Sequence, residues 1–459
     1  MLTIEQCERA RMARDPRFDG KFFVLVKSTG IFCRPICKVR APLEKNVEYA
    51  HSAVEAMHRG FRPCLRCRPD SSPHSFAWQG VQTTVERAMR LLTEDYSRSI
   101  EDVSERLGVS ARYLRKLMTS HLQLSPKQFR LFNQILLAKR LLHGSNMNIE
   151  QVAQGAGFSS SRQLQHHMKQ ICSLTPTQIR SAHHAASAKQ ANIQLMLYYQ
   201  GEYDWPSMRD FFKRRQIDNN EAVSQTSFTK SLNIHNRNVR VCMRHKASAR
   251  AFEVSYSHEH VDLSAAIIER VNKILDLQAN PYVIYDAIEK AGLKPSQINR
   301  GIRIPGLSCR FEAGVRAILG QQVSVQAAIT QLNRLQQGLV GAAQSFITPE
   351  QLRDADLSFL KMPGARKAAL QNFAALMAQH PNADFDQWLA LKGIGPWTVN
   401  YVKLRATSST DVWLDTDLII RQQIKKLHDS FEQQKAPPFT PEHAAPWRSY
   451  LTLALWNLA

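Results

Sequence analysis

Two short segments near the start of the chain, Gly30-Ile-Phe-Cys-Arg-Pro-Ile-Cys37 and Gly60-Phe-Arg-Pro-Cys-Leu-Arg-Cys67, decide the fold that we predict for this region. They carry four cysteines with gaps of 3, 26 and 2 residues: Cys33, Cys37, Cys64 and Cys67. Four thiolates hold a tetrahedral Zn²⁺ at about 2.3 Å, each close pair fits one turn, and the long gap closes the loop. The quartet therefore predicts a small Zn²⁺-binding domain over residues 1–75.

Disulfides explain the same four cysteines less well. A two-residue gap strains a bridge, and a chain of 459 residues without an apolar leader has little need of one. The other cysteines, Cys7, Cys172, Cys242 and Cys309, are scattered singly and are typical of reduced, buried thiols. No stretch reaches the roughly 20 apolar residues of a membrane span. We therefore expect a cytoplasmic protein without a membrane partner.

The charge of the chain indicates an acidic partner. The formal net charge is +21, with +6 in residues 1–75, +8 in residues 76–190 and +7 in the remainder. Positive charge in every part favours nucleic-acid binding along the whole chain. Solvated surface charge is the alternative.

The length of the chain predicts about three domains.

A repeat follows the cysteine region. Ile100, Val103, Leu107, Gly108 and Ser110 recur at an offset of 49 as Ile149, Val152, Ala156, Gly157 and Ser159. After one inserted residue, Met118 and Arg130 recur as Met168 and Arg180 at an offset of 50. Each copy predicts a helix, a tight turn at the glycine and a second helix that begins at a serine cap. We therefore expect a double helix-turn-helix domain over residues 80–182.

The second helix of each copy has an apolar inner face and a polar outer face, as a groove-reading helix needs. The outward residues predicted to contact DNA are Arg112, Arg115 and Lys116 in the first copy and Arg162, Gln163, Gln165 and Lys169 in the second. A plain helical bundle with a basic surface is the alternative.

These first 180 residues resemble the Ada adaptive-response regulators, which join a zinc domain to an AraC-type DNA-binding domain. The resemblance implies that Cys33 accepts a methyl group from a methylphosphotriester in DNA, with Arg34, Lys38 and Arg40 positioning the phosphate. We expect loss of one negative charge at the cysteines to raise DNA affinity and switch on transcription. Promoter DNA and RNA polymerase are the partners that this implies. A purely structural Cys33 is the alternative.

The rest of the chain begins with alternating apolar runs, such as Val239–Met243 and Phe252–Tyr256, and then becomes helical. We predict a β cap over residues 192–262 and a mainly α domain over residues 263–459. Within the α domain, Leu391-Lys-Gly-Ile-Gly-Pro-Trp-Thr-Val-Asn-Tyr401 predicts a hairpin between helices. Gly393 and Gly395 would let backbone N–H groups approach a DNA phosphate.

The hairpin and the acidic Asp417, twenty residues after Trp397, resemble the helix-hairpin-helix DNA glycosylases. Flanking segments of the sequence narrow this resemblance to the AlkA-like 3-methyladenine glycosylases. The supporting segments are 203–205, 311–325 and 446–450. The resemblance implies that Asp417 is the catalytic carboxylate, with Asp415 as a competitor. It also implies a pocket for an extruded cationic base, lined by Phe211, Trp397, Tyr401 and Trp456. Each aromatic residue has a core role as its alternative.

Two positions modify this expectation. Trp397 stands where glycosylases with lyase activity place a Schiff-base lysine, so we predict an enzyme that leaves an abasic site uncut. Gln322 stands where the best-known relatives place a leucine wedge, so it is the candidate wedge, but a polar side chain lacks the apolar stacking contribution of leucine. The last active-site motif of many Ada proteins, Pro-Cys-His-Arg, is absent from the sequence.

The predicted protein is thus a multidomain α+β chain that combines a phosphotriester sensor, a regulator and a base-excision enzyme. Its expected partners are promoter DNA and duplex DNA with alkylated bases and methylphosphotriesters, and we expect a monomer associated with a bacterial nucleoid. The rival is a transcription factor whose C-terminal domain binds damage without catalysis, with Asp417 serving only as a helix cap.

Overall fold

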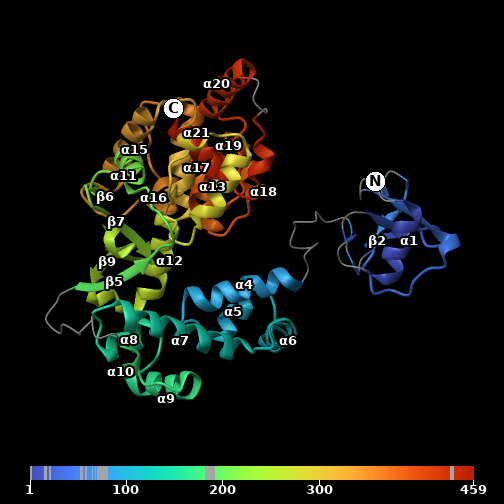
Figure 1. The fold of residues 1–459 in the computed structure, drawn as a ribbon, viewed down its shortest axis with the longest axis horizontal. Helices are drawn as coiled ribbons and strands as arrows, with labels where there is room; N and C mark the ends of the chain where they lie inside the picture. Colours follow the sequence, from blue (N-terminus) through green and yellow to red (C-terminus); the bar gives the residue numbers. More distant parts are fainter. Residues whose placement is uncertain are drawn as a thin grey trace. The chain divides into compact units, whose positions relative to one another are not determined.

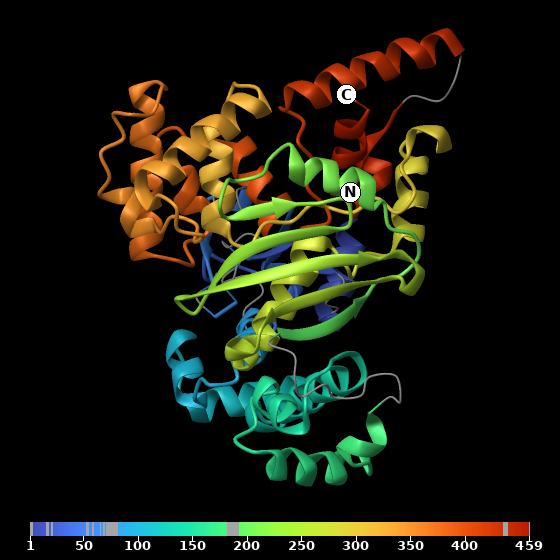
Figure 2. The same cartoon turned by 90° about the vertical axis from the view of Figure 1, so that its left-hand side faces the viewer.

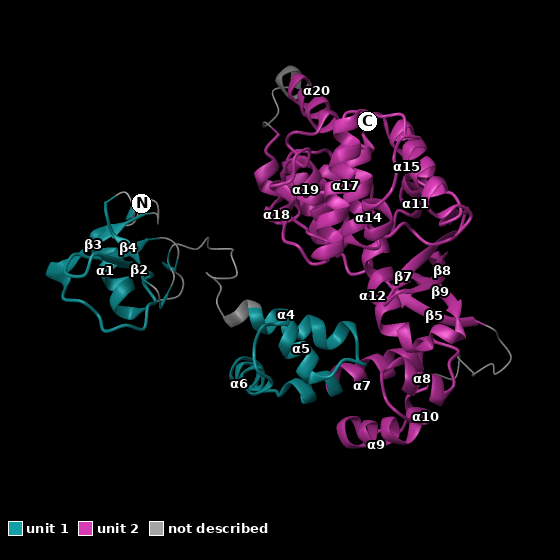
Figure 3. Cartoon of the chain, turned by 180° about the vertical axis from the view of Figure 1, so that it is seen from behind, with its two compact units in different colours: residues 1–131 teal, residues 132–459 magenta. Residues whose placement is uncertain are grey.

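The computed structural model describes residues 3–14, 18–19, 22–51, 55–56, 59–64, 66–67, 69, 81–180, 192–434 and 439–458. The chain divides into two compact units, an N-terminal unit of residues 1–131 and a C-terminal unit of residues 132–459 (Figure 3). The predicted domain boundaries at residues 75–80 and 182–191 lie outside the described residues. None of the described helices is long and apolar enough to cross a membrane.

The N-terminal unit begins with a helix beside a sheet of four strands in the order β3-β1-β2-β4 (Figure 1). The elements are α1 (Ile4–Ala13), β1 (Phe23–Val26), β2 (Ile31–Cys33), the 3-10 turn η2 (Glu44–Asn46), β3 (Val47–Ala50) and β4 (Arg62–Pro63). Strand β1 is buried along its whole length and pairs antiparallel with β2 and β3, whereas β2 and β4 are parallel. The parallel pairing brings the end of β2, at Cys33, beside Cys64, which follows β4.

The first helix-turn-helix comes next. Its helices are α4 (Val81–Glu94), α5 (Ile100–Arg106) and α6 (Ala111–Leu122). Ser99 caps α5 through the Asp102 amide at 3.0 Å, and Ser110 caps α6, as predicted, through the Tyr113 amide at 3.2 Å. Gly108 turns between them with φ +67°.

The second helix-turn-helix repeats this arrangement, but the serine that caps its second helix is not the one expected from the repeat offset. It contains α7 (Pro126–Gly144), α8 (Ile149–Gly155), α9 (Ser161–Cys172) and α10 (Pro176–Ile179). Gly157 makes the turn with φ +75°, but the cap of α9 is Ser160, which accepts from the Gln163 amide at 3.2 Å. The prediction that Ser110 recurs as Ser159 was therefore wrong, because the inserted residue lies before the cap. The division between the two units falls inside α7.

The predicted β cap is a five-stranded antiparallel sheet in the order β5-β9-β8-β7-β6 (Figure 2). Its elements are β5 (Asn192–Tyr198), α11 (Trp205–Lys213), β6 (Glu221–Val223), β7 (Ser227–Ile234), β8 (Arg237–Lys246), η3 (Ala247–Ala249), β9 (Ala251–Ser257) and η4 (His258–Leu263). The alternating runs quoted above lie in β8 and β9, where every second side chain is buried.

The helical part follows without a break. Its elements are α12 (Ser264–Leu275), α13 (Pro281–Lys290), η5 (Pro295–Gln297), α14 (Arg310–Leu319), α15 (Val325–Val340), α16 (Pro349–Arg353), α17 (Gly364–Gln379), α18 (Phe385–Leu389), α19 (Pro396–Ala406), α20 (Leu418–Gln434), η6 (Pro441–Ala444) and α21 (Arg448–Asn457). Among the described residues, one apolar cluster lies around α14 and α17 and another around α21, and Trp397 touches both. The multidomain α+β fold class is confirmed.

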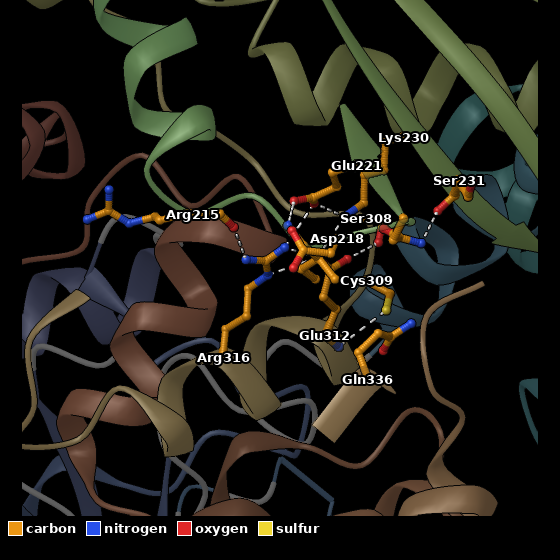
Figure 4. Close-up of polar contacts among 12 residues, drawn as sticks. Arg215, Asp218, Glu221, Lys230, Ser231, Ser308, Cys309, Glu312, Arg316 and Gln336 are labelled. Atoms are coloured by element: carbon orange, nitrogen blue, oxygen red, sulfur yellow. Dashed lines mark hydrogen bonds and ion pairs between the residues drawn. The ribbon is translucent and has the colours of Figure 1, made fainter. Parts of the chain in front are cut away.

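A buried ion cluster fastens α14 to the sheet (Figure 4). Lys230 of β7 donates to Glu221 at 2.5 Å and to Glu312 of α14 at 2.7 Å, while Arg316 contacts both carboxylates at 2.9 Å. Burial alone would raise the pKa of Glu312, but Lys230 and Arg316 hold that pKa well below its usual range. Removing one member of such a group costs about 3–5 kcal/mol, because an unpaired charge stays buried.

Candidate functional site

The four predicted cysteine ligands meet in one cluster. Their sulfur atoms all lie within 4.8 Å of one another. Cys33 and Cys64 are buried at the ends of β2 and β4, while Cys37 and Cys67 are half-buried in the turns that follow. The Arg34 amide also donates to the Cys67 sulfur at 3.4 Å, a contact that favours a thiolate.

The donor set fits Zn²⁺. A hydrogen bond with Cys37 raises the pKa of Cys33, and the same bond lowers the pKa of Cys37 to about 2. Four adjacent thiolates repel one another, so a divalent cation at their centre would stabilise them, and four sulfurs are a complete tetrahedral set for zinc.

The predicted phosphate contacts near the cysteines have different surroundings. Lys38 and Arg40 are exposed. Arg34 is not free in this way, because its guanidinium binds both carboxylate oxygens of Asp19, with Nε to Oδ1 at 2.9 Å. The Arg34 side chain is only 13% exposed. Contact between Arg34 and a DNA phosphate therefore requires this ion pair to open or to be shared.

The outward residues of both recognition helices are exposed. They are Arg112, Arg115 and Lys116 on α6 and Arg162, Gln163, Gln165 and Lys169 on α9. The inner faces carry Leu114 and Met118 on α6 and Leu164 and Met168 on α9, none of which is exposed. Gln163 differs from the others, because its side-chain oxygen accepts from the amide and hydroxyl of Ser159 at 3.0 Å.

Asp417 lies where α20 begins, and its carboxylate accepts four hydrogen bonds. Oδ2 accepts from the Trp397 indole at 3.0 Å. Oδ1 accepts from the Trp456 indole at 3.3 Å and from the amides of Ile419 and Ile420 at 3.1 and 3.2 Å. Asp417 is thus both the cap of α20 and the meeting point of two predicted pocket residues. Asp415 is exposed and shows no comparable set of donors.

Three of the four predicted pocket aromatics lie together. Trp397 stacks on Tyr401 one turn along α19, with ring centroids 5.5 Å apart and planes at 24°. Tyr401 is 6.5 Å from Trp456. Phe211 lies beside two cations: the guanidinium of Arg215 is 3.7 Å from its ring centroid and that of Arg405 is 4.7 Å from it. The electron-rich faces of Phe211 are therefore engaged by the chain's own cations.

Arg405 is a residue that sequence reasoning missed. It is only 3% exposed, donates from Nη1 to the Tyr401 hydroxyl at 2.7 Å, and lies between Tyr401 and Phe211. Its Nε donates to the Pro305 carbonyl. The only signal in the sequence is its position four residues after Tyr401, on the same face of a helix. Nothing in that spacing indicates burial.

Hydrogen bonds join the hairpin, which contains Gly393 and Gly395, to the wedge loop, which contains the predicted wedge Gln322. Gly393 has φ +92°, and a Cβ there would meet Ala369 at 2.9 Å, so glycine is required. Gly395 begins α19 with space around it. Gln322 is exposed with φ +55°. Its neighbour Gln321, also missed, ties the wedge loop to the hairpin through the Gly393 carbonyl at 2.8 Å and Thr398 at 3.1 Å.

Three family descriptions match successive parts of the chain: the metal binding domain of Ada at residues 6–70, a helix-turn-helix domain at residues 103–182 and the AlkA N-terminal domain at residues 194–308. A probable bifunctional transcriptional activator/DNA repair enzyme AlkA of Mycobacterium tuberculosis strain H37Rv is 31% identical over 480 aligned positions, which cover 99% of this chain and 96% of that protein. The chain belongs to this bifunctional AlkA family.

Two shorter relatives match the two ends of this bifunctional AlkA chain. The DNA-3-methyladenine glycosylase 2 of Escherichia coli K12 is 31% identical over 279 residues, 57% of this chain and 95% of the relative. The bifunctional transcriptional activator/DNA repair enzyme Ada of the same strain is 32% identical over 181 residues, 39% of this chain and 49% of the relative. The Ada metal-binding match and the four-cysteine cluster confirm Zn²⁺ as the cofactor.

Proposed function

We propose that the chain is an alkylation-damage response protein with two chemical activities. Its C-terminal unit excises alkylated bases such as 3-methyladenine from duplex DNA, and its N-terminal cysteines accept methyl groups from methylphosphotriesters and so regulate transcription. The observation that carries the first activity is the carboxylate of Asp417, held by the indoles of Trp397 and Trp456. The relatives named above have the corresponding activities in their names.

The two carboxylate oxygens of Asp417 differ in how many further hydrogen bonds they can accept. A carboxylate offers about two lone-pair sites on each oxygen. Oδ1 accepts three hydrogen bonds and has none to spare, whereas Oδ2 accepts one, from Trp397. Oδ2 is therefore the oxygen that can accept from a water molecule or face a developing positive charge.

Base excision needs both of those tasks. An alkylated purine already carries positive charge, so the bond between its nitrogen and C1′ breaks with the electron pair leaving on the base, which departs neutral. The ionised Asp417 stabilises the oxocarbenium sugar and directs water to C1′, and the proton of the water passes to solvent. Trp397 supplies an indole on α19, not an amine, so no Schiff base forms there and the product is an intact strand with an abasic site.

The pocket rings serve the extruded base. Trp397, Tyr401 and Trp456 present neighbouring aromatic faces beside Asp417. Such faces attract a cationic base, which selects alkylated over normal purines. Phe211 supports this pocket from behind Arg405. Gly393, Gly395 and Gln322 would hold the DNA backbone and fill the vacated stack.

Methyl transfer uses Cys33. Its sulfur attacks the methyl carbon of the phosphotriester, the carbon–oxygen bond breaks, and the electron pair stays on the phosphate oxygen. Bound Zn²⁺ keeps the sulfurs deprotonated near neutral pH, so no separate base is needed. Cys33 is only 6% exposed, and the exposed cations that follow it in the chain, Lys38 and Arg40, would attract the phosphate toward it. Each protein molecule reacts once.

The regulatory role follows from the same step. Methylation removes one negative charge from the cysteine cluster, which favours DNA, and the helices α6 and α9 read a promoter. We infer RNA polymerase as the protein partner, a monomeric state, and a cytoplasmic location on the nucleoid.

Two measurements test this function. Free 3-methyladenine released from methylated duplex DNA is quantified by chromatography, and the masses of the cysteine peptides are compared before and after exposure to DNA with methylphosphotriesters. We expect base release, and the mass of one methyl group on the Cys33 peptide alone. No base release would refute the glycosylase, and methyl on other cysteines would refute the assignment of Cys33.

A further inference from the structure

The second helix-turn-helix is packed against the glycosylase part within the C-terminal unit. The segment after α7 adds to the free edge of strand β5: Ser145 forms an antiparallel bridge with Leu195. The Asn146 backbone amide donates to the Gln194 carbonyl at 3.1 Å. The Asn146 side chain accepts from the Gln194 amide at 2.8 Å through Oδ1 and donates to the Asn192 carbonyl at 3.2 Å through Nδ2. The edge of the sheet is thereby covered.

A second contact joins α8 to η4. A Cβ on Gly155 would lie 3.1 Å from the Ser264 hydroxyl and 3.2 Å from the Val261 carbonyl, so α8 approaches η4 as closely as a glycine allows. Ser264 is fully buried and hydrogen-bonds to Tyr256 of β9 at 2.7 Å. Strand pairing at one point and close helix packing at another fix both the position and the rotation of the helix-turn-helix.

The contacts also fix which way α9 faces. The inner residues Leu164 and Met168 have no exposure, and α9 packs on α8, so its polar face points away from the glycosylase. From α8 the contacts continue through η4, β9, β8, β7 and β6 to α14 and then α19. That path is on the order of 50 Å at ordinary strand and helix spacings. Figure 1 shows α9 at one end of this unit and α19 with α20 toward the other.

From this arrangement we propose a further activity: the C-terminal unit holds two duplex segments at once, one on α9 and one at the hairpin with Gly393. The inference rests on the proposed function, since both faces must bind DNA. A molecule bound to a promoter through α9 keeps its excision site open to a second duplex or to a distant segment of the same one. Repair and promoter occupancy therefore do not compete for this unit.

Bridging is tested with the full-length protein and two duplexes of about 40 bp, which give each face several helical turns. One duplex is biotinylated and lesion-free, and the other is fluorescent and contains one reduced abasic-site analogue. The protein should retain the fluorescent duplex on streptavidin beads. Replacing Arg162 and Lys169 with alanine should lower retention at least about tenfold, because the cations that face phosphates on α9 are lost.

The matched control replaces Arg244 and Lys246 of β8 with alanine. It removes the same two residue types at a place away from α9 and the hairpin, and it should leave retention unchanged. Equal retention by the α9 variant would overturn the proposal, because the second duplex would then be held by the N-terminal unit. Loss of retention by the unaltered protein, with each duplex bound singly, would overturn it too. The abasic analogue is not cleaved, so failure of base release would refute the glycosylase without touching this result.

The docking itself is tested by hydrogen exchange in the full-length protein. The Gly155→Leu variant forces a side chain against Ser264 and should speed exchange of the Gln194 and Asn146 amides at least about tenfold. The milder Asn146→Ala variant, which keeps the strand bridge, should speed the Gln194 amide alone. Unchanged exchange in both variants would show that the helix-turn-helix is not docked on β5.

Discussion

Replacing Asp417 with asparagine removes the negative charge and leaves most of its contacts. The amide oxygen can still accept from the Ile419 and Ile420 amides, and asparagine caps helices about as well as aspartate. The change falls on Oδ2, which becomes an NH₂ group facing the Trp397 indole N–H at 3.0 Å. The substitution therefore separates the charge of Asp417 from its role as the cap of α20.

The expected loss is large in rate and small in stability. A carboxylate about 4 Å from an oxocarbenium carbon, at an effective dielectric constant of about 20, stabilises it by about 4 kcal/mol. That is about a thousandfold in kcat. The new asparagine NH₂ group and the Trp397 indole N–H are both donors and cannot pair. The free energy of unfolding should therefore fall by about 1–3 kcal/mol, because one hydrogen bond is lost. The folded protein should therefore bind damaged DNA and fail to release the base.

The assay is single-turnover release of 3-methyladenine from methylated duplex, with binding measured separately by anisotropy on an abasic analogue. Asp415→Asn is the matched control, because Asp415 is exposed two residues away, and its rate should stay within about twofold. Asp417→Asn activity within about tenfold of the unaltered protein would refute the assignment and support the rival in which Asp417 is only a cap. An equal loss in both variants would point to general damage to this loop.

Four further outcomes follow from the contacts. Gln321→Ala removes both hydrogen bonds between the wedge loop and the hairpin, and should raise KM about tenfold with kcat little changed, measured by steady-state release. Tyr401→Phe leaves the buried Arg405 donor unpaired and should lower Tm by about 2–8 °C in calorimetry. Burial raises the pKa of Asp276 from 3.8 to about 6. The contribution of this carboxyl group to stability is therefore present below pH 3.8 and lost as the pH rises through about 6. The Asp276→Asn variant should lose that pH dependence when Tm is measured as a function of pH. Chelation should release one Zn²⁺ per chain, counted with a metal dye, and expose four further thiols.

The spacing of residues in the sequence predicted the cysteine cluster and the repeat, because local geometry alone sets them. Four sulfurs within 4.8 Å follow from two close pairs, and the glycine turns follow from the φ values that only glycine adopts freely. The error at Ser159 has the same origin: an inserted residue before a cap leaves two serines that fit, and the hydrogen bond from Gln163 decides for Ser160.

The residues that sequence reasoning missed act through tertiary neighbours. In the sequence, Arg405 cannot be distinguished from other basic residues of helices. Its role depends on α11, which places Phe211 beside its guanidinium. Gln321 adjoins the predicted wedge, yet its partners lie more than seventy residues away at Gly393 and Thr398. Phe211 is the opposite case, because its type and position suggest a base-facing ring, whereas two guanidiniums occupy its surroundings.

The helix cap formed by Asp417 and its proposed catalytic role depend on each other. The amides of Ile419 and Ile420 and the Trp456 indole all bind Oδ1, so they fix the rotation of the carboxylate and saturate that oxygen. Oδ2 then has one orientation, against Trp397, with a lone pair left for water. A carboxylate free to rotate would offer either oxygen and place neither. Capping α20 therefore also orients the oxygen that the proposed chemistry uses, and a helix cap at this position supports the enzyme as much as the rival.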